Sequence, residues 1–272
     1  MAVSKPSISR AHSLWKNIRR WGKNSPAYIV VHFTGGFKDN IAAMLGIYKS
    51  YVERGSNAHY LVGASAIWQL VDPKTYYCTY SCGSPVGKKN ACLVPFWGPA
   101  EYQGPMSMSH AGIVGHSNSI NVEICSCKAG NRRCRPTDDE WYFSDAAYGN
   151  AVELCAWLCD EFGIKVNNIV MHNQVTGKLC PAMWCNKPGA ESGFEKFRMD
   201  VAYLLNDMQE DTPVSPNQEP EGGMLYVAQG ALYYSRPYED APIVGQAPTS
   251  SAVNYTYKKD SFYYTENGWV LG

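Results

Sequence analysis

The sequence has no run of residues long and apolar enough to span a bilayer, so we expect no insertion into a membrane. It also has no net charge, because its 24 basic and 24 acidic residues balance. That balance gives no general electrostatic attraction to nucleic acid or anionic lipid, and we expect neither as a partner. Residues 1–23 are basic but lack the apolar run of a secretory signal. We therefore expect the protein to be made in a cytosol without a signal peptide.

The composition is that of an ordinary globular protein. The 272 residues are 45% hydrophobic, which is enough to fill a core, and the length suggests one large domain or a large and a small one. Ten cysteines would indicate disulfides in a secreted chain, but in a cytosolic chain they are typical of core thiols or metal ligands. Cys125, Cys127 and Cys134 leave a second metal site open, although their spacing favours plain thiols.

The hydrophobic pattern up to residue 208 predicts interspersed strands and helices. Residues 28–33 form a short β-branched and aromatic run that ends at a Thr-Gly-Gly turn, as buried strands do. Residues 144–162 carry an apolar stripe at helical spacing. Residues 119–125 alternate, so the side chain of Glu123 points away from the apolar face of that strand. We expect further strands at 59–62, 66–71 and 168–171, helices at 10–21, 40–54 and 191–208, and long loops at 73–118 and 126–138. The predicted fold class is α/β, with a mixed central sheet flanked by helices.

The composition changes near residue 209. Residues 209–223 contain three prolines, several acidic residues and two terminal glycines, which is typical of a linker. Residues 224–272 contain short tyrosine-rich segments separated by Gly, Pro and Asn, which predicts a small all-β barrel. We therefore expect a large domain at 1–208, a linker at 209–223 and a small β module at 224–272.

A histidine, a lysine and a cysteine lie close together after the strand at 168–171. His172 ends that strand, Lys178 follows six residues later, and Cys180 follows eight residues later. His32 ends the strand at 28–33, and the ends of neighbouring strands meet at one edge of a sheet. Zinc accepts mixed nitrogen and sulfur donors, and three protein ligands leave a fourth position open for catalysis. Taken alone, the residues equally allow a buried histidine and a buried thiol on either side of a surface turn.

The lysine between two candidate ligands is unusual, because a metal ion repels a neighbouring cation. An anionic transition state would compensate for that repulsion, so Lys178 indicates electrostatic catalysis beside the metal. Hydrolysis of an amide also needs a base that takes a proton from water, and Glu123 is the candidate. On its own, Glu123 is more typical of a strand carboxylate that faces solvent or an arginine.

Five segments together resemble the zinc-dependent N-acetylmuramoyl-L-alanine amidases, the phage lysozyme-type enzymes related to the peptidoglycan recognition proteins. The segments are Val31–Gly35, Ala58–Val62, Ser109–Gly112, Asn118–Cys125 and His172–Pro181. The resemblance covers roughly residues 26–206, and the last segment is its most specific part. It implies hydrolysis of the amide between N-acetylmuramic acid and L-alanine in bacterial peptidoglycan.

The resemblance also implies roles for individual residues. One zinc ion per chain would be bound by His32, His172 and Cys180. Lys178 would stabilise the oxyanion, and Glu123 matches the general base of one branch of the family. Another branch uses a tyrosine where this chain has Ala58, so more weight falls on Glu123.

Three further residues are expected to line the substrate cleft, namely His59, Tyr60 and His110. For His59, a strand histidine that donates a hydrogen bond is the simpler interpretation. The family often has tryptophan where this chain has Ser109, which weakens the assignment of His110.

The C-terminal module resembles a bacterial SH3-like wall-binding domain in its aromatic segments Leu225–Val227, Leu232–Pro237 and Gly268–Val270. A catalytic domain, a linker, a wall-binding module and no export signal together resemble a phage endolysin, which waits in the cytosol and acts on the wall after release. We keep two alternatives, a non-catalytic peptidoglycan-binding protein and a bacterial autolysin or wall-recycling amidase.

Overall fold

The computed structural model describes residues 3–11, 22–51, 58–78, 104–130, 135–209, 223–234, 243–259, 261–265 and 267–272. The chain forms two compact units, residues 1–209 and residues 210–272.

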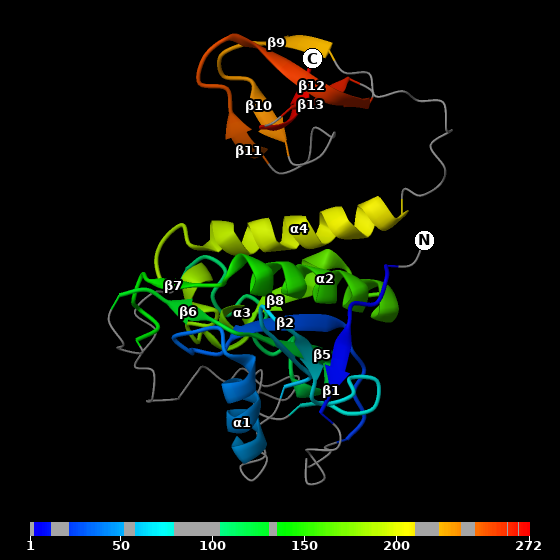
Figure 1. The fold of residues 1–272 in the computed structure, drawn as a ribbon, viewed down its shortest axis with the longest axis vertical. Helices are drawn as coiled ribbons and strands as arrows, with labels where there is room; N and C mark the ends of the chain where they lie inside the picture. Colours follow the sequence, from blue (N-terminus) through cyan, green and yellow to red (C-terminus); the bar gives the residue numbers. More distant parts are fainter. Residues whose placement is uncertain are drawn as a thin grey trace. The chain divides into compact units, whose positions relative to one another are not determined.

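The larger unit is built on a mixed sheet of six strands, shown in Figure 1. The strands are β1 (Ile8–Arg10), β2 (Tyr28–Phe33), β3 (Tyr60–Val62), β4 (Ile67–Gln69), β5 (Ser119–Ile124) and β8 (Ile169–Met171). Their order is β1-β4-β3-β5-β2-β8, and every neighbouring pair is parallel except β3 and β4. The predicted α/β class with a mixed central sheet is therefore confirmed.

Helices α2 (Asp145–Phe162) and α4 (Glu191–Gln209) pack against each other and cover one face of the sheet (Figure 1). The Ser144 side chain accepts a hydrogen bond from the Ala147 backbone and begins α2, an N-cap typically worth about 1 kcal/mol. Gly163 ends the helix in the left-handed conformation, at φ 64°. The core beneath the helices contains Ile29, Val31, Ile120, Val122, Ile124, Leu154, Leu158, Phe194 and Phe197.

The other face of the sheet carries the alternate residues of each strand. Helix α1 (Ile41–Tyr51) packs there through Met44 and Tyr48, which join a separate apolar cluster with Leu61 and Leu70. The short helix α3 (His172–Thr176) and a turn-rich segment at residues 104–118 cover the β2–β8 end of the same face. The short helices η4 (His116–Asn118), η5 (Val166–Asn168) and η6 (Ala182–Trp184) and the strands β6 (Cys127–Lys128) and β7 (Trp141–Tyr142) complete the unit.

The local predictions match most of these elements. The helices expected at 144–162 and 191–208, and the strands expected at 28–33 and 119–125, agree with the structure to within a residue or two. The helix expected at 10–21 falls mostly on residues that the structure does not describe, and Arg10 belongs to strand β1 instead. The predicted loop at 126–138 contains the two-residue strand β6, which pairs with β7.

The smaller unit has a second six-stranded sheet in which every neighbouring pair is antiparallel. Its strands are β9 (Gly223–Val227), β10 (Leu232–Tyr234), β11 (Ile243–Gln246), β12 (Ser251–Lys259), β13 (Phe262–Thr265) and β14 (Gly268–Leu271). Val227, Tyr233, Ala247 and Val270 form its core. The described residues of this unit contain only β-strands and turns, as the tyrosine-rich pattern predicts. Residues 210–222 of the predicted linker lie outside the described ranges.

Within the ranges that the structure describes, none of the helices combines the length and the apolar character that crossing a membrane requires.

Candidate functional site

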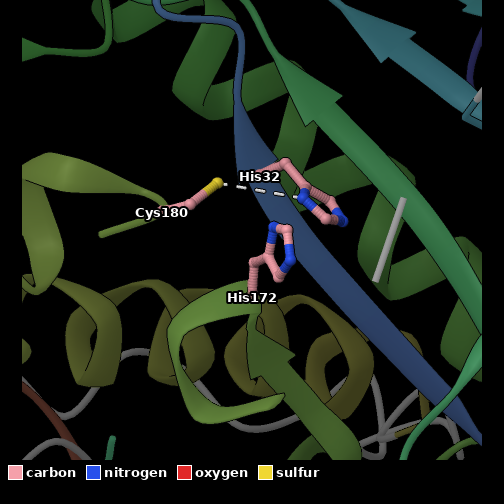
Figure 2. Close-up of side chains that lie close together, drawn as sticks. All are labelled: His32, His172 and Cys180. Carbon is pink, nitrogen blue, oxygen red and sulfur yellow. Dashed lines mark hydrogen bonds between the residues drawn. The ribbon is translucent and has the colours of Figure 1, made fainter. Parts of the chain in front are cut away.

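Three potential metal ligands converge at the end of strand β2. His32, His172 and Cys180 are all buried, and their ligand atoms lie within 4.8 Å of one another. The Cys180 Sγ atom is 3.8 Å from His32 Nδ1, and the two imidazole rings are 4.7 Å apart between centroids. Figure 2 shows the sulfur and both rings turned toward a common point.

The backbone explains why residues so far apart in sequence meet here. Strands β2 and β8 are parallel and pair Val31 with Met171. The residues that follow these two in the chain, His32 on β2 and His172 at the start of α3, therefore reach the same edge. Helix α3 then turns the chain back toward the sheet. The Asn173 backbone N–H donates to the Cys180 carbonyl at 2.9 Å, which fixes the loop that carries the thiol.

The donor set fits a zinc ion. Two donors on a tetrahedral zinc lie roughly 3.6 Å apart, given bonds of about 2.1 Å to nitrogen and 2.3 Å to sulfur. The observed 3.8 Å between Cys180 Sγ and His32 Nδ1 is close to that separation. The His172 Nδ1 atom is buried and finds no hydrogen-bond partner among the described residues, which is the situation of a ligand atom without its metal.

Both histidines are held in the neutral form that binds metal. Burial lowers the pKa of His32 to about 3. The hydrogen bond to Asn121 acts to raise this pKa, whereas the Lys178 charge acts to lower it. Burial also lowers the pKa of His172 well below its ordinary value, with further contributions from His32 and Lys178. A neutral imidazole offers a lone pair without first losing a proton.

Glu123 and Lys178 lie beside the three ligands. Glu123 pairs with His32 in the register of β5 and β2. Burial raises the pKa of Glu123 to about 7, although the Lys178 charge and a hydrogen bond from the Tyr48 hydroxyl act in the opposite direction. A carboxylate with such a pKa can both accept and return a proton near neutral pH. The arrangement therefore combines a candidate metal centre, a proton acceptor and a cation.

Residues 22–183 match the sequence model of the N-acetylmuramoyl-L-alanine amidases. The chain belongs to this family. The match contains every element that carries the candidate metal centre and lies within residues 1–209, referred to below as the amidase-family unit.

Curated relatives come from bacilli. The chain is 28% identical over 180 residues to N-acetylmuramoyl-L-alanine amidase CwlL of Bacillus licheniformis, covering 65% of this chain and 40% of the relative. It is 26% identical over 136 residues to N-acetylmuramoyl-L-alanine amidase BlyA of Bacillus subtilis strain 168, covering 47% of this chain and 34% of the relative. The matched region thus spans well under half the length of these curated relatives.

Among solved structures, that of PlyL is 20% identical, with a TM-score of 0.48, and the match covers 72% of this chain and 97% of that one. The PlyG catalytic domain is 18% identical, also with a TM-score of 0.48, over 79% of this chain and 99% of that one.

The amidase-family unit does not place Tyr60 or His59 in the candidate site, which corrects the expectation that they line a substrate cleft. The Tyr60 side chain is 1% exposed and packs in the core on the α2 face, on the other side of the sheet from His32. His59 is fully buried, and both of its ring nitrogens bond to backbone, Nδ1 to Asn121 N at 2.9 Å and Nε2 to Tyr76 O at 3.0 Å. The alternative interpretation of His59 as a hydrogen-bonded strand residue describes it better.

His110 lies apart from the three ligands. Its backbone N–H donates to the Gln174 carbonyl at 2.8 Å, which attaches its segment to α3. Its half-buried ring is 6.2 Å from the ring of Tyr28, at the start of β2, whereas His32 is near the end of that strand. A substrate contact at His110 remains a prediction.

Asn121 and Tyr48 are site residues that the sequence patterns did not single out. Asn121 is fully buried, and its Oδ1 atom accepts a hydrogen bond from His32 Nε2 at 3.0 Å. The alternation of apolar and polar residues at 119–125 could have indicated Asn121, because it places Asn121 on the same face of the strand as Glu123. Tyr48 reaches Glu123 from α1, a contact between distant segments that local sequence does not reveal.

The antiparallel strand pair β6–β7 borders the candidate metal centre. The β7 residue Trp141 packs edge-on against Phe33 at 5.3 Å and belongs to the same apolar cluster as Cys180. Cys127 on β6 and Cys125, which follows β5, are free thiols. Cys134 lies outside the described residues. In the part of the chain that the structure describes, His32, His172 and Cys180 are the only group spaced to hold a metal ion.

Proposed function

We propose that this protein is a zinc-dependent N-acetylmuramoyl-L-alanine amidase that hydrolyses the amide between N-acetylmuramic acid and L-alanine in bacterial peptidoglycan. The observation that carries the proposal is the buried convergence of His32, His172 and Cys180, with an unpartnered His172 Nδ1, in a member of this family. Zinc bound there would act as a Lewis acid that polarises the scissile carbonyl and activates water.

Glu123 provides the proton transfer that the hydrolysis needs. Its carboxylate accepts a proton from the attacking water as the new C–O bond forms. It then returns that proton to the amide nitrogen, which leaves as the amine of L-alanine when the C–N bond breaks. Its pKa of about 7 leaves a useful fraction ionised at neutral pH while keeping the protonated form acidic enough to donate.

Lys178 provides positive charge where the carbonyl oxygen becomes negative. Its ammonium lies close enough to both histidines and to Glu123 to affect the pKa of all three. The side chain is half-buried, so water screens its charge less than it would at an open surface. An oxyanion formed beside the metal would pair with this cation, and the pairing is absent in the ground state.

We further propose that residues 223–272 form an SH3-like module that binds the cell wall, as in an endolysin that acts on the wall after release from the cytoplasm. Met224 and Tyr226 support the proposal, because they are 76% and 72% exposed on the same face of strand β9. Exposed aromatic and apolar side chains of this kind are typical of binding surfaces.

Digestion of purified cell walls tests the proposed reaction. Hydrolysis should release new L-alanine amino termini, detected by amine labelling and mass spectrometry, and a zinc chelator should stop their appearance. His172→Ala serves as the metal-deficient control. A protein that binds zinc and walls but produces no L-alanine termini would be a non-catalytic peptidoglycan-binding protein, and the proposal would be wrong.

A further inference from the structure

The Asn121 side chain belongs to a buried chain of hydrogen bonds that ends at a candidate metal ligand. The Ser119 hydroxyl donates to the Gly115 carbonyl at 2.7 Å. The Asn121 amide nitrogen Nδ2 donates to the Ser119 oxygen at 3.2 Å, and Asn121 Oδ1 bonds to His32 Nε2 at 3.0 Å. Ser119 and Asn121 are fully buried, so water is not available to replace these partners.

The direction of each bond follows from the chemistry of the groups. Ser119 has one hydroxyl hydrogen, which the Gly115 carbonyl takes, so its oxygen must accept from Asn121. That fixes the amide with its nitrogen toward Ser119 and its oxygen toward His32. The amide oxygen can only accept, and His32 Nε2 must therefore carry a hydrogen. The Nδ1 atom of His32 is then the one with a free lone pair, and it faces Cys180 Sγ at 3.8 Å.

The backbone of Asn121 is held from the neighbouring strand. Its N–H donates to His59 Nδ1 at 2.9 Å, and its carbonyl accepts from the His59 backbone N–H at 3.0 Å. The second ring nitrogen of His59 bonds to the Tyr76 carbonyl at 3.0 Å, so the His59 ring itself is fixed. These contacts leave the Asn121 amide little freedom to move away from His32.

We propose that Asn121 is a positioning residue that selects the Nε2-protonated tautomer of His32 and aims its Nδ1 lone pair at the metal position. The inference rests on the proposed function for the metal itself. It assigns His59 a supporting role, since His59 is fully buried and holds the Asn121 backbone. Hydrogen bonds from a ligating histidine to an outer partner typically contribute 10- to 100-fold to metal affinity.

The first test uses the zinc-free parental protein, so it requires neither metal nor activity. Long-range ¹H–¹⁵N correlation spectra of histidine-labelled protein distinguish the two imidazole tautomers, and His32→Gln identifies the His32 signals. We expect the His32 hydrogen on Nε2. A hydrogen on Nδ1, or a mixture of both tautomers, would overturn the inference.

The second test measures zinc affinity by competition with a chelator of known affinity. Asn121→Leu removes the acceptor, and zinc binding should weaken by roughly 10- to 100-fold. Asn121→Asp keeps an acceptor oxygen toward His32 and should retain near-parental affinity. Asn150→Leu is the matched control, because it removes a partly buried amide on α2 that donates to the Gly63 carbonyl and does not contact His32.

The outcomes separate this inference from the proposed function. A parental protein that binds no zinc would contradict the proposed function, while the tautomer measurement would still judge the role of Asn121. A folded Asn121→Leu protein with parental zinc affinity, together with a parental protein that binds zinc, would contradict only the role of Asn121. If Asn121→Leu does not fold, two other measurements decide the role of Asn121. One is the zinc affinity of Asn121→Asp relative to the parental protein, and the other is the tautomer spectrum of His32.

Discussion

Replacing Glu123 with glutamine should lower activity and raise stability at the same time. Glutamine keeps the shape of the side chain but cannot accept a proton. General base catalysis typically contributes about 100- to 10,000-fold, so turnover should fall by that order. Zinc content should not change, because the carboxylate is not one of the three converging ligands.

The gain in stability follows from the raised pKa of Glu123. Burial raises this pKa from 4.5 to about 7, so the folded protein binds the proton more tightly than the unfolded chain does. Stability therefore falls as the pH rises from 4.5 to 7 and stays reduced above pH 7. Glutamine is neutral at every pH and avoids this loss. After allowance for the partial exposure of Glu123, we expect the zinc-free variant to be ~1–3 kcal/mol more stable at pH 8.

The assay compares thermal unfolding and muropeptide turnover of the parental and Glu123→Gln proteins between pH 4 and pH 8. Each kcal/mol corresponds to roughly 2–4 °C in Tm for a unit of this size. The difference in Tm should largely vanish at pH 4, below the ordinary pKa. Glu153→Gln, which neutralises an exposed carboxylate on α2, should change neither turnover nor Tm. Near-parental turnover in Glu123→Gln would refute a role as base, and an unchanged Tm at pH 8 would refute the burial argument.

Three further predictions concern the metal, the cation and the second unit. Metal analysis should find one zinc per chain, and the double variant His172→Ala, Cys180→Ala should lose it; full zinc content in that variant would place the metal elsewhere. Lys178→Ala should retain zinc while its turnover falls on the order of 100- to 1,000-fold, because one oxyanion partner is missing. Near-parental turnover would mean that Lys178 does not contact the oxyanion. A protein ending at Gln209 should fold and cleave soluble muramyl peptides while losing affinity for whole walls. Loss of folding on that truncation would show that the two units share a core.

The sequence predicted that His32, His172 and Cys180 would converge, because their positions depend on local features. His32 and His172 each follow a short apolar run that ends a parallel strand, and parallel strands bring their ends to one edge. The eight-residue spacing from His172 to Cys180 accommodates one short helix and a return loop, closed by Gly177 at φ 78°. None of this requires knowledge of distant contacts.

The errors arose where pairing between distant strands decides the outcome. Tyr60 pairs with Val122, so it shares the apolar face of β5 and points away from the ligands. Nothing in the segment around Tyr60 indicates that register. Strand β1 escaped detection for a similar reason, since its three residues are strand-like only through their pairing with β4. The role inferred for Asn121 likewise depends on its contact with His32, 89 residues away.

The division of the sheet into two faces has a consequence for genetic screens. Helices α2 and α4 cover one face, whereas His32, Asn121 and Glu123 lie on the other. Random substitutions should therefore fall into two phenotypic classes. Those in the core on the helix side reduce the number of folded molecules, and those at His32 or Glu123 on the opposite side reduce the activity of each folded molecule. A screen that scores only the clearing of a bacterial lawn would merge these classes, and a parallel measurement of soluble protein would separate them.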